Sequence, residues 1–247
     1  MHNNNIILDK FYENAFDLKT HLANYLKISI KQVEDKLPFA SQDLASIHPG
    51  SINPEDATIF YEDKVGHAHL FDLAAWHLTS RDYIADTLRL QSMFAKGNLL
   101  DFGGGIGTHS LAAAQLPQVD HVWFVDLNPD NREFVKERAN ELGLESRFSF
   151  HRDLSCVEGV KFDTLICLDV LEHIPDPSAQ LVTFQQNLSK EGIALLNWYF
   201  FKGFKGEFPF HFDDKEMIEN FFITLQDKFI EIFHPYLITA RVYKVNL

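Results

Sequence analysis

The stretch Asn98–Ala114 reads NLLDFGGGIGTHSLAAA and predicts a strand, a tight turn and a helix in succession. Its apolar start, which ends at Asp101, is typical of a buried strand. The four glycines that follow let the backbone turn sharply and leave no Cβ between the main chain and a ligand. They are Gly103, Gly104, Gly105 and Gly107. Doubly wound α/β proteins use this arrangement to bind a nucleoside at the carboxyl edge of the sheet.

The spacing of the glycines separates two classes of nucleotide-binding protein. The dinucleotide fingerprint G-x-G-x-x-G requires a third glycine where this chain has Thr108. The pattern here is instead D-x-G-x-G-x-G from Asp101 to Gly107. It resembles motif I of the class I S-adenosylmethionine (SAM) methyltransferases. By itself the turn also fits an ordinary strand-to-helix connection, so the downstream residues must decide.

Strands and helices alternate after the glycine turn, as in βαβ units. A second predicted strand, His121–Leu127, ends at Asp126, where a carboxylate can accept hydrogen bonds from both ribose hydroxyls of a nucleoside. A third, Arg147–Asp153, ends at Asp153, whose carboxylate can accept from the exocyclic amine of adenine. Asp126 supports a nucleoside without distinguishing a methyltransferase from an NAD-dependent oxidoreductase.

A fourth predicted strand, Phe162–Val170, continues into LDVLEHIPDP, Leu168 to Pro177. This segment resembles the DVLEH segment of small-molecule SAM methyltransferases and is more specific than the glycine turn. Methyltransferases that act on nucleic-acid bases carry a double proline after this strand, and the chain has none there. Protein arginine methyltransferases use a pair of glutamates, and the chain offers only Glu172.

The resemblance implies a Rossmann-like, doubly wound α/β fold with a seven-stranded sheet in the order 3-2-1-4-5-7-6, the last strand antiparallel. We expect a helical N-terminal lead over residues 1–96 and a SAM-binding domain over residues 97–247. SAM is the implied cofactor and S-adenosylhomocysteine its product. Phe102 and Leu154 are placed to sandwich the adenine ring. The implied cofactor-binding residues are Asp101, Phe102, Gly103, Gly104, Gly105, Gly107, Asp126, Leu127, Asp153, Leu154, Leu168, Asp169, Val170 and His173.

Composition excludes several classes of protein. The formal net charge of −13 disfavours binding to a nucleic acid backbone. No run of apolar residues is long enough to cross a membrane, and the amino terminus lacks a signal-peptide pattern. Of the two cysteines, Cys156 and Cys167, the second lies in an apolar run and is expected to be a buried free thiol. These features predict a cytoplasmic protein.

The first hundred residues are expected to be helical. Apolar residues at helical spacing predict one helix over Asp9–Lys27, and Ser29 with Gln32 predicts a capping box for a short second one. Two further helices are expected at Asp63–Leu78 and Ser80–Ala95. His48–Pro54 is expected to be a loop. This lead either packs on the sheet edge or forms a lid that excludes water from the active site.

Three histidines in the lead, His67, His69 and His77, lack the convergent ligands that a metal needs, and no metal site is predicted. One of them can line the acceptor pocket instead, as can Tyr61, Trp76 or Tyr83. The phenylalanine-rich segment Phe200–Phe212 is expected either to form a wall of that pocket or to pack in the core. The candidate catalytic bases are His211 and His173, chosen for their place after the fifth and fourth strands.

The sequence therefore predicts a SAM-dependent methyltransferase that acts on a small organic or peptide-like molecule, most simply at oxygen, with a role in natural-product biosynthesis. Methyl transfer to nitrogen or carbon is the nearest alternative. A non-catalytic SAM-binding protein and an NAD-dependent oxidoreductase remain as other classes. We expect a small-molecule acceptor and neither a nucleic acid nor a membrane as partner. Both a monomer and a homodimer are compatible with the sequence.

Overall fold

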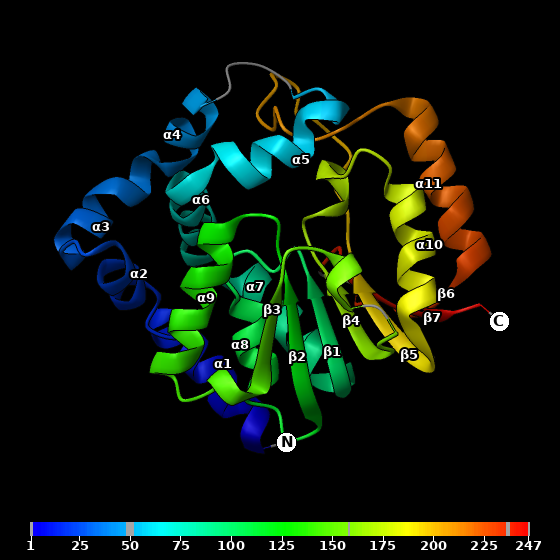
Figure 1. Cartoon of the computed structure of the whole chain (residues 1–247), viewed down its shortest axis with the longest axis horizontal. Coiled ribbons are helices and arrows are strands. Elements are labelled where there is room, and N and C mark those ends of the chain that lie inside the picture. The colour runs from blue at the N-terminus through cyan, green and yellow to red at the C-terminus, as the bar shows by residue number, and fades with distance from the viewer. Residues whose placement is uncertain (1, 48–51, 158, 236–237, 247) are drawn as a thin grey trace.

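The computed structural model describes residues 2–47, 52–157, 159–235 and 238–246. A seven-stranded sheet in the order β3-β2-β1-β4-β5-β7-β6 forms its centre (Figure 1). β7 pairs antiparallel with both β5 and β6, and the other pairs are parallel. The expected fold class and strand order are thus confirmed. The strands are β1 (Gly97–Phe102), β2 (Val119–Val125), β3 (Phe148–His151), β4 (Phe162–Cys167), β5 (Leu188–Leu196), β6 (Phe229–Phe233) and β7 (Arg241–Val245).

Helices cover both faces of the sheet, because neighbouring strand residues point to opposite faces. Leu99 packs with apolar residues of α1, α7, α8 and α9, whereas Leu100 packs on the other face with those of α10 and α11. No helix among the described residues has the length and apolar character needed to cross a bilayer. Cys167 is a buried free thiol in β4, as expected. The helices on these two faces are α1 (His2–Asn14), α7 (Arg81–Phe94), α8 (Thr108–Ala114), α9 (Pro129–Glu141), α10 (Pro177–Asn187) and α11 (Lys215–Lys228).

The helical lead runs from the amino terminus around one face and across the upper edge of the sheet (Figure 1). Ser29 and Gln32 form the predicted capping box at the start of α3. Most of the loop predicted at His48–Pro54 lies outside the described residues. The elements of the lead beyond α1 are α2 (Leu18–Leu26), α3 (Ile30–Lys36), η1 (Leu37–Phe39), α4 (Ala40–Ile47), η2 (Pro54–Asp56), α5 (Ala57–Ile59), the π-helical turn η3 (Phe60–Lys64) and α6 (Gly66–Thr79).

The single helix predicted over Asp9–Lys27 is wrong. The chain breaks between α1 and α2, where Ala15, Phe16 and Asp17 all have positive φ angles of 53° to 56°. Apolar residues at helical spacing on both sides of the break concealed it, because both helices bury the same kind of face. The buried Arg138 holds this corner by donating hydrogen bonds to the carbonyl oxygens of Ala15 and Phe16. A long-range contact therefore stabilises a turn that the local sequence does not signal.

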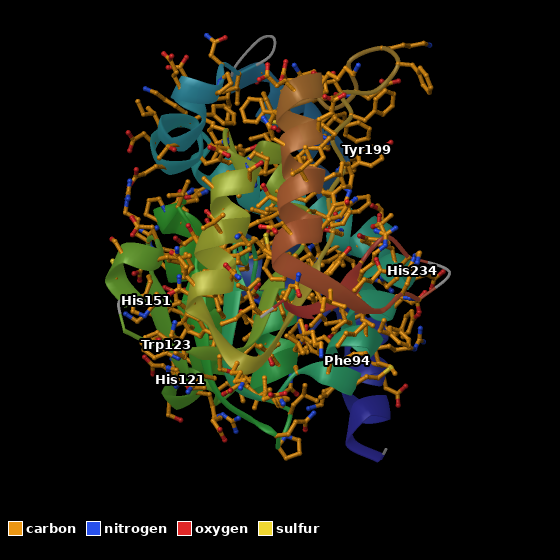
Figure 2. The ribbon with its side chains drawn as sticks, turned by 90° about the vertical axis from the view of Figure 1, so that its right-hand side faces the viewer. Phe94, His121, Trp123, His151, Tyr199 and His234 are labelled. Carbon is orange, nitrogen blue, oxygen red and sulfur yellow. The ribbon has the colours of Figure 1, made fainter. Side chains whose placement is uncertain are left out.

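Aromatic side chains brace the outer strands. Trp123 of β2 stacks on His151 of β3 with ring centroids 5.3 Å apart, and His121 meets the indole edge-on (Figure 2). Phe94 at the end of α7 packs on Phe233 of β6 at 5.3 Å. His121 and His151 thus pack against Trp123 at the side of the molecule, away from the glycine turn.

Gly107, the N-cap of α8, has a φ of 74°, and a Cβ there would lie 2.5 Å from the Val135 side chain in α9. We expect Gly107→Ala to lower the free energy of unfolding by about 2–4 kcal/mol, the sum of left-handed strain and overpacking. Gly143→Ala is the matched control, since Gly143 has a φ of 69° and no atom within 4 Å of the added Cβ. It should cost only about 1–2 kcal/mol. Urea unfolding of both variants measures the difference, and equal losses would contradict this account.

Candidate functional site

The glycine turn lies at the carboxyl end of β1, next to the point where the strand order reverses between β1 and β4. Open α/β sheets bind ligands outside the strand ends at such a switch point. Asp101, 4% exposed, accepts a hydrogen bond from Ser110 Oγ at 2.5 Å and so ties the strand to α8. Burial raises the pKa of Asp101 to about 7 against the effect of that bond. Asp101 therefore stabilises the glycine turn by linking the strand before it to the helix after it.

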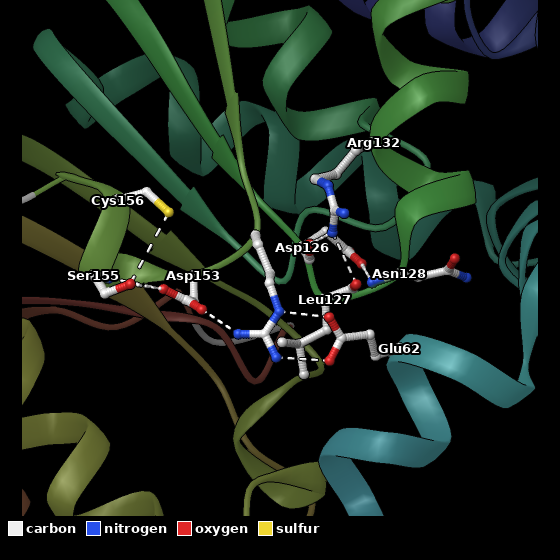
Figure 3. A network of polar contacts seen from close by, with 9 residues as sticks. Glu62, Asp126, Leu127, Asn128, Arg132, Asp153, Ser155 and Cys156 are labelled. Atoms are coloured by element: carbon white, nitrogen blue, oxygen red, sulfur yellow. Dashed lines mark hydrogen bonds and ion pairs between the residues drawn. The ribbon is translucent and has the colours of Figure 1, made fainter.

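Asp126 follows β2 and joins three parts of the site. Its Oδ2 accepts from Gly105 N at 2.8 Å, and its Oδ1 accepts from Asn128 N at 2.9 Å and Asn131 Nδ2 at 3.1 Å. Burial still raises the pKa of Asp126 to about 6, so these bonds do not offset the loss of solvent. Arg132 donates to the carbonyl oxygens of Asp126 and Leu127 (Figure 3). The backbone at the end of β2 is thereby fixed.

Two buried acceptors at this position fit the hydroxyl groups of a nucleoside. Asp126 is 7% exposed, and the buried Oδ1 of the neighbouring Asn131 has no hydrogen-bond partner among the described residues. Unpaired buried acceptors are costly and are satisfied when a donor binds. The residues present thus fit the ribose of SAM, the cofactor that the resemblance implies.

Asp153 lies at the end of β3 in a network of charges (Figure 3). It accepts from Ser155 N at 2.9 Å and pairs with Arg152, which also forms an ion pair with Glu62 of η3. Ser155 Oγ also donates to Asp153 Oδ1 at 2.5 Å, and this side-chain hydrogen bond is the largest of the effects that lower the pKa of Asp153. Arg152 therefore joins the third strand to the helical lead.

The two residues expected to sandwich adenine, Phe102 and Leu154, both pack with the apolar residues around Leu100, on the face of the sheet that α10 and α11 cover. The Phe102 ring contacts Phe184 of α10 edge-on at 5.1 Å, and Leu154 begins a short 3-10 helix, η5 (Leu154–Val157). Their shared face is compatible with contact to one planar ligand.

Asp169 follows β4 with a φ of 56°. Asn197, the residue after β5, holds this strained position: its Oδ1 accepts from Asp169 N at 2.6 Å, and its Nδ2 donates to Asp169 Oδ1 at 2.7 Å. The same amide donates to the hydroxyl of Tyr83 in α7 at 2.7 Å. The flanking Leu168 and Val170 pack on opposite faces of the sheet.

Glu172, His173 and His211 form a cluster in which the possible ligand atoms all lie within 4.8 Å of one another. Burial raises the pKa of Glu172 to about 8 and lowers that of His173 to about 3. Burial also lowers the pKa of His211. The His173 ring contacts Tyr61, whose hydroxyl lies 2.9 Å from Nδ1. The structure thus brings both candidate catalytic histidines together and adds Glu172 and Tyr61.

The helical lead closes over this edge of the sheet. Leu73 of α6 lies against Gly105, His77 Nδ1 lies 2.9 Å from Thr108 Oγ1, and Asn128 Nδ2 donates to the carbonyl oxygen of Gly66. These contacts support the proposal that the lead forms a lid.

The three histidines of the lead have separate surroundings. His67 lies beside Asp130, His69 lies between Asn131 and Tyr61, and His77 contacts Thr108 and His109. Among the described residues they do not gather with carboxylates or cysteines into a metal site. Tyr83 and Trp76 were the other aromatic candidates for lining the acceptor pocket. The Tyr83 hydroxyl donates to Asp169 Oδ1 at 3.4 Å and so lies at the site, whereas Trp76 is 44% exposed.

The phenylalanine-rich segment serves two purposes. Phe212 is buried and packs, with Phe210, against Phe60 and the lead. Phe204 is 95% exposed, and Phe208 is 42% exposed. The segment therefore contributes to a core between the lead and the sheet domain and also leaves aromatic side chains at the surface beside His211.

Sequence reasoning missed Asn131 and Asn197 and assigned no site role to Glu172. Asn197 follows the apolar run of β5, so a polar residue at the carboxyl end of a strand was the available signal. Asn131 lies two positions into a helix, where an asparagine gives no signal of its own. Glu172 was part of the quoted motif, but its burial beside His211 depends on tertiary structure.

The strand order and the glycine turn next to Asp126 define a class I, Rossmann-like methyltransferase fold. Residues 75–201 match the family described as "methyltransferase domain". This match covers about half of the sequence, and the chain belongs to this family of SAM-dependent methyltransferases.

Relatives and solved structures are consistent with that membership. The chain is 28% identical over 131 residues to a ubiquinone biosynthesis O-methyltransferase of Haemophilus ducreyi, covering 47% of this chain and 53% of the relative. A Xylella fastidiosa protein of the same name is 32% identical over 100 residues, with 40% and 38% covered. The chain thus spans about half the length of these relatives, or less. The PH0226 protein of Pyrococcus horikoshii shares the fold at a TM-score of 0.54 and 15% identity, with 68% and 92% covered. The riboflavin-analogue dimethyltransferase RosA of Streptomyces davawensis does so at 0.52 and 17%, with 72% and 57% covered.

Proposed function

We propose that this protein transfers the methyl group of SAM to an oxygen atom of a small organic molecule. The observation that carries the proposal is the hydrogen bond from Gly105 N to Asp126 Oδ2 at the switch point, which joins the glycine turn to the carboxylate that we assign to the ribose. The names of the related ubiquinone biosynthesis O-methyltransferases support oxygen as the acceptor atom. They favour a hydroxylated intermediate of such a pathway over the broader class of natural products.

SAM supplies a methyl group already activated by its sulfonium. The residues of this chain then have to hold the acceptor oxygen about 3–3.5 Å from the methyl carbon and in line with the bond that breaks. Bound SAM would supply the methyl group and keep the electron pair of its carbon–sulfur bond, and the hydroxyl proton of the acceptor would leave to solvent or a nearby base. Asp126 and Asn131 would hold the ribose, and Asp153 the adenine. We place the acceptor beside His173 and His211, which are neutral at pH 7 because burial lowers both pKa values.

An RNA acceptor is the main competing possibility, because a protein described as an rRNA methylase from Clostridium thermocellum shares the fold at a TM-score of 0.50. The net charge of −13 argues against it, since phosphate groups would be repelled. The missing double proline after β4 argues in the same direction. We therefore propose a small-molecule acceptor.

The test has two arms. Calorimetry should show micromolar binding of S-adenosylhomocysteine and none of NADH. SAM labelled in its methyl group should then transfer label to phenols or carboxylic acids in a panel that also contains amines and unmodified RNA. Transfer to amines or RNA alone would refute oxygen as the acceptor, and binding of NADH in place of S-adenosylhomocysteine would refute the methyltransferase activity.

A further inference from the structure

We propose that Glu172, His173 and His211 form a binding site for a divalent transition-metal ion. The three side chains converge from two separate segments: the turn η6 (Leu171–His173) after β4, and the loop between β5 and α11. Local sequence pattern does not reveal this grouping, because His211 lies 38 positions after His173. The expectation of no metal site rested on the histidines of the lead and did not consider this cluster.

An unpartnered oxygen points to a missing ligand. Glu172 is 2% exposed, and its Oε2 has no hydrogen-bond partner among the described residues. No lysine or arginine forms an ion pair with Glu172 in the part of the chain that the structure describes. A buried, unpaired carboxylate oxygen is costly unless a cation or donor binds it.

The two imidazoles are oriented as metal ligands usually are. The Nδ1 atoms of His173 and His211 lie 3.1 Å from the carbonyl oxygens of Phe210 and Phe201, respectively. A carbonyl oxygen can only accept, so Nδ1 of His211 carries the hydrogen and its Nε2 keeps its lone pair. His173 has the same tautomer when the Tyr61 hydroxyl, 2.9 Å from its Nδ1, accepts alongside the Phe210 carbonyl oxygen. Metal-bound histidines show this arrangement, in which a backbone carbonyl fixes the ring through the second nitrogen.

The scaffold around the three side chains is closed on several sides. Phe212 N donates to the carbonyl oxygen of Glu172 at 2.7 Å and thereby pins the loop that carries His211 to the turn that carries Glu172. Tyr61 contacts His173 from the π-helical turn η3. The two imidazole rings lie 4.7 Å apart and nearly perpendicular. Ligand atoms about 2.1 Å from a tetrahedral ion are about 3.4 Å apart, so small side-chain shifts complete the site.

The donor set selects the kind of ion. Two imidazole nitrogens and one carboxylate oxygen suit Zn²⁺, Co²⁺, Mn²⁺ or Fe²⁺ better than Mg²⁺ or Ca²⁺, which prefer oxygen. Three protein ligands leave at least one coordination position open. Both histidines are only partly buried, so that position is accessible. If the proposed methyl transfer to oxygen is correct, the open position would bind the acceptor oxygen next to the cofactor. That role rests on the proposed function, whereas the metal site does not.

Titration of the metal-free protein with Co²⁺ tests the site, because protein-bound cobalt absorbs visible light. We expect the wild type to bind one equivalent of Co²⁺. The apparent affinity for Co²⁺, read from the absorption, should fall at least tenfold in His211→Gln and, independently, in Glu172→Gln. His121→Gln is the matched control, since His121 packs on Trp123 far from the cluster and should bind cobalt as the wild type does. Circular dichroism and S-adenosylhomocysteine binding check that each variant is folded.

The outcomes separate the two proposals. Cobalt binding that is lost in both cluster variants but not in the control supports the metal site, whether or not a methyl acceptor is found. Equal binding by all proteins, or none by the wild type, overturns it. In that case binding of S-adenosylhomocysteine by the same wild-type sample leaves the proposed function standing.

Discussion

Replacement of Arg138 by methionine should lower the free energy of unfolding by about 3–5 kcal/mol, the largest loss we expect from one substitution that keeps side-chain volume. Arg138 in α9 is fully buried and is charged at pH 7, although burial lowers its pKa to about 9. Its guanidinium donates to the carbonyl oxygens of Ile106, Ala15 and Phe16 and to His21 Nδ1. Methionine would leave those buried acceptors unpaired, each at a cost of about 1–3 kcal/mol before relaxation.

Urea unfolding followed by circular dichroism measures the effect. Arg89→Met is the control, since Arg89 is half exposed on α7 and interacts with Asp86 one turn away and with Tyr12 of α1 at the surface. The free energy of unfolding of Arg89→Met should differ from that of the wild type by no more than about 0.5 kcal/mol. Arg138→Lys should fall between the two, because an ammonium cannot reach several carbonyls at once. A loss below about 1 kcal/mol in Arg138→Met would show that the left-handed corner at Ala15–Asp17 does not depend on this side chain.

Replacement of Asp126 by alanine should weaken S-adenosylhomocysteine binding about tenfold to a hundredfold, the equivalent of about 1.5–3 kcal/mol for charge-assisted hydrogen bonds. The carboxylate is the acceptor that we assign to the ribose hydroxyls, and it also receives Gly105 N and Asn128 N. Calorimetry measures the change. Asp130→Ala is the control, because it removes a carboxylate that lies four residues after Asp126 in the chain and pairs with His67. Its affinity should equal that of the wild type.

The pH dependence identifies the group. Burial raises the pKa of Asp126 to about 6, so the acid is protonated below that pH and offers fewer lone pairs to a hydroxyl donor. Wild-type affinity should therefore fall about tenfold as the pH is lowered from about 8 to about 5. Asp126→Asn should lose that dependence. Any dependence that remains near neutral pH belongs to Asp101 or Glu172, whose pKa values burial raises to about 7 and about 8. An unchanged profile in Asp126→Asn would contradict the assignment.

Local sequence patterns were sufficient to predict the strands and helices of the sheet domain, because each of these elements is marked by residues close to it in the chain. The glycine turn after Asp101 and the apolar run of β4 each lie where expected. Strand order followed from the resemblance carried by the glycine turn and LDVLEHIPDP. Element ends differed by a few residues; the second strand, for example, was expected at His121–Leu127 and lies at Val119–Val125.

The lead was harder to predict, since its organisation depends on the sheet domain. The left-handed corner between α1 and α2 forms around Arg138, which is 122 positions from Phe16. The π-helical turn that carries Tyr61 and Glu62 contacts His173 and Arg152 from far along the chain. Helical periodicity reports only which residues are apolar, so it predicts helices here without showing where they meet the domain.

The sequence by itself determined the fold and the family, and it placed Asp126 and Asp153 after the carboxyl ends of two strands, because these features depend on residues close together in the chain. Only the tertiary structure decided that Glu172, His173 and His211 meet, that Asn197 supports Asp169, and that α6 lies over the glycine turn. Those contacts join segments whose spacing in the sequence carries no signal. They exist because burial of the lead against the sheet brings the segments together.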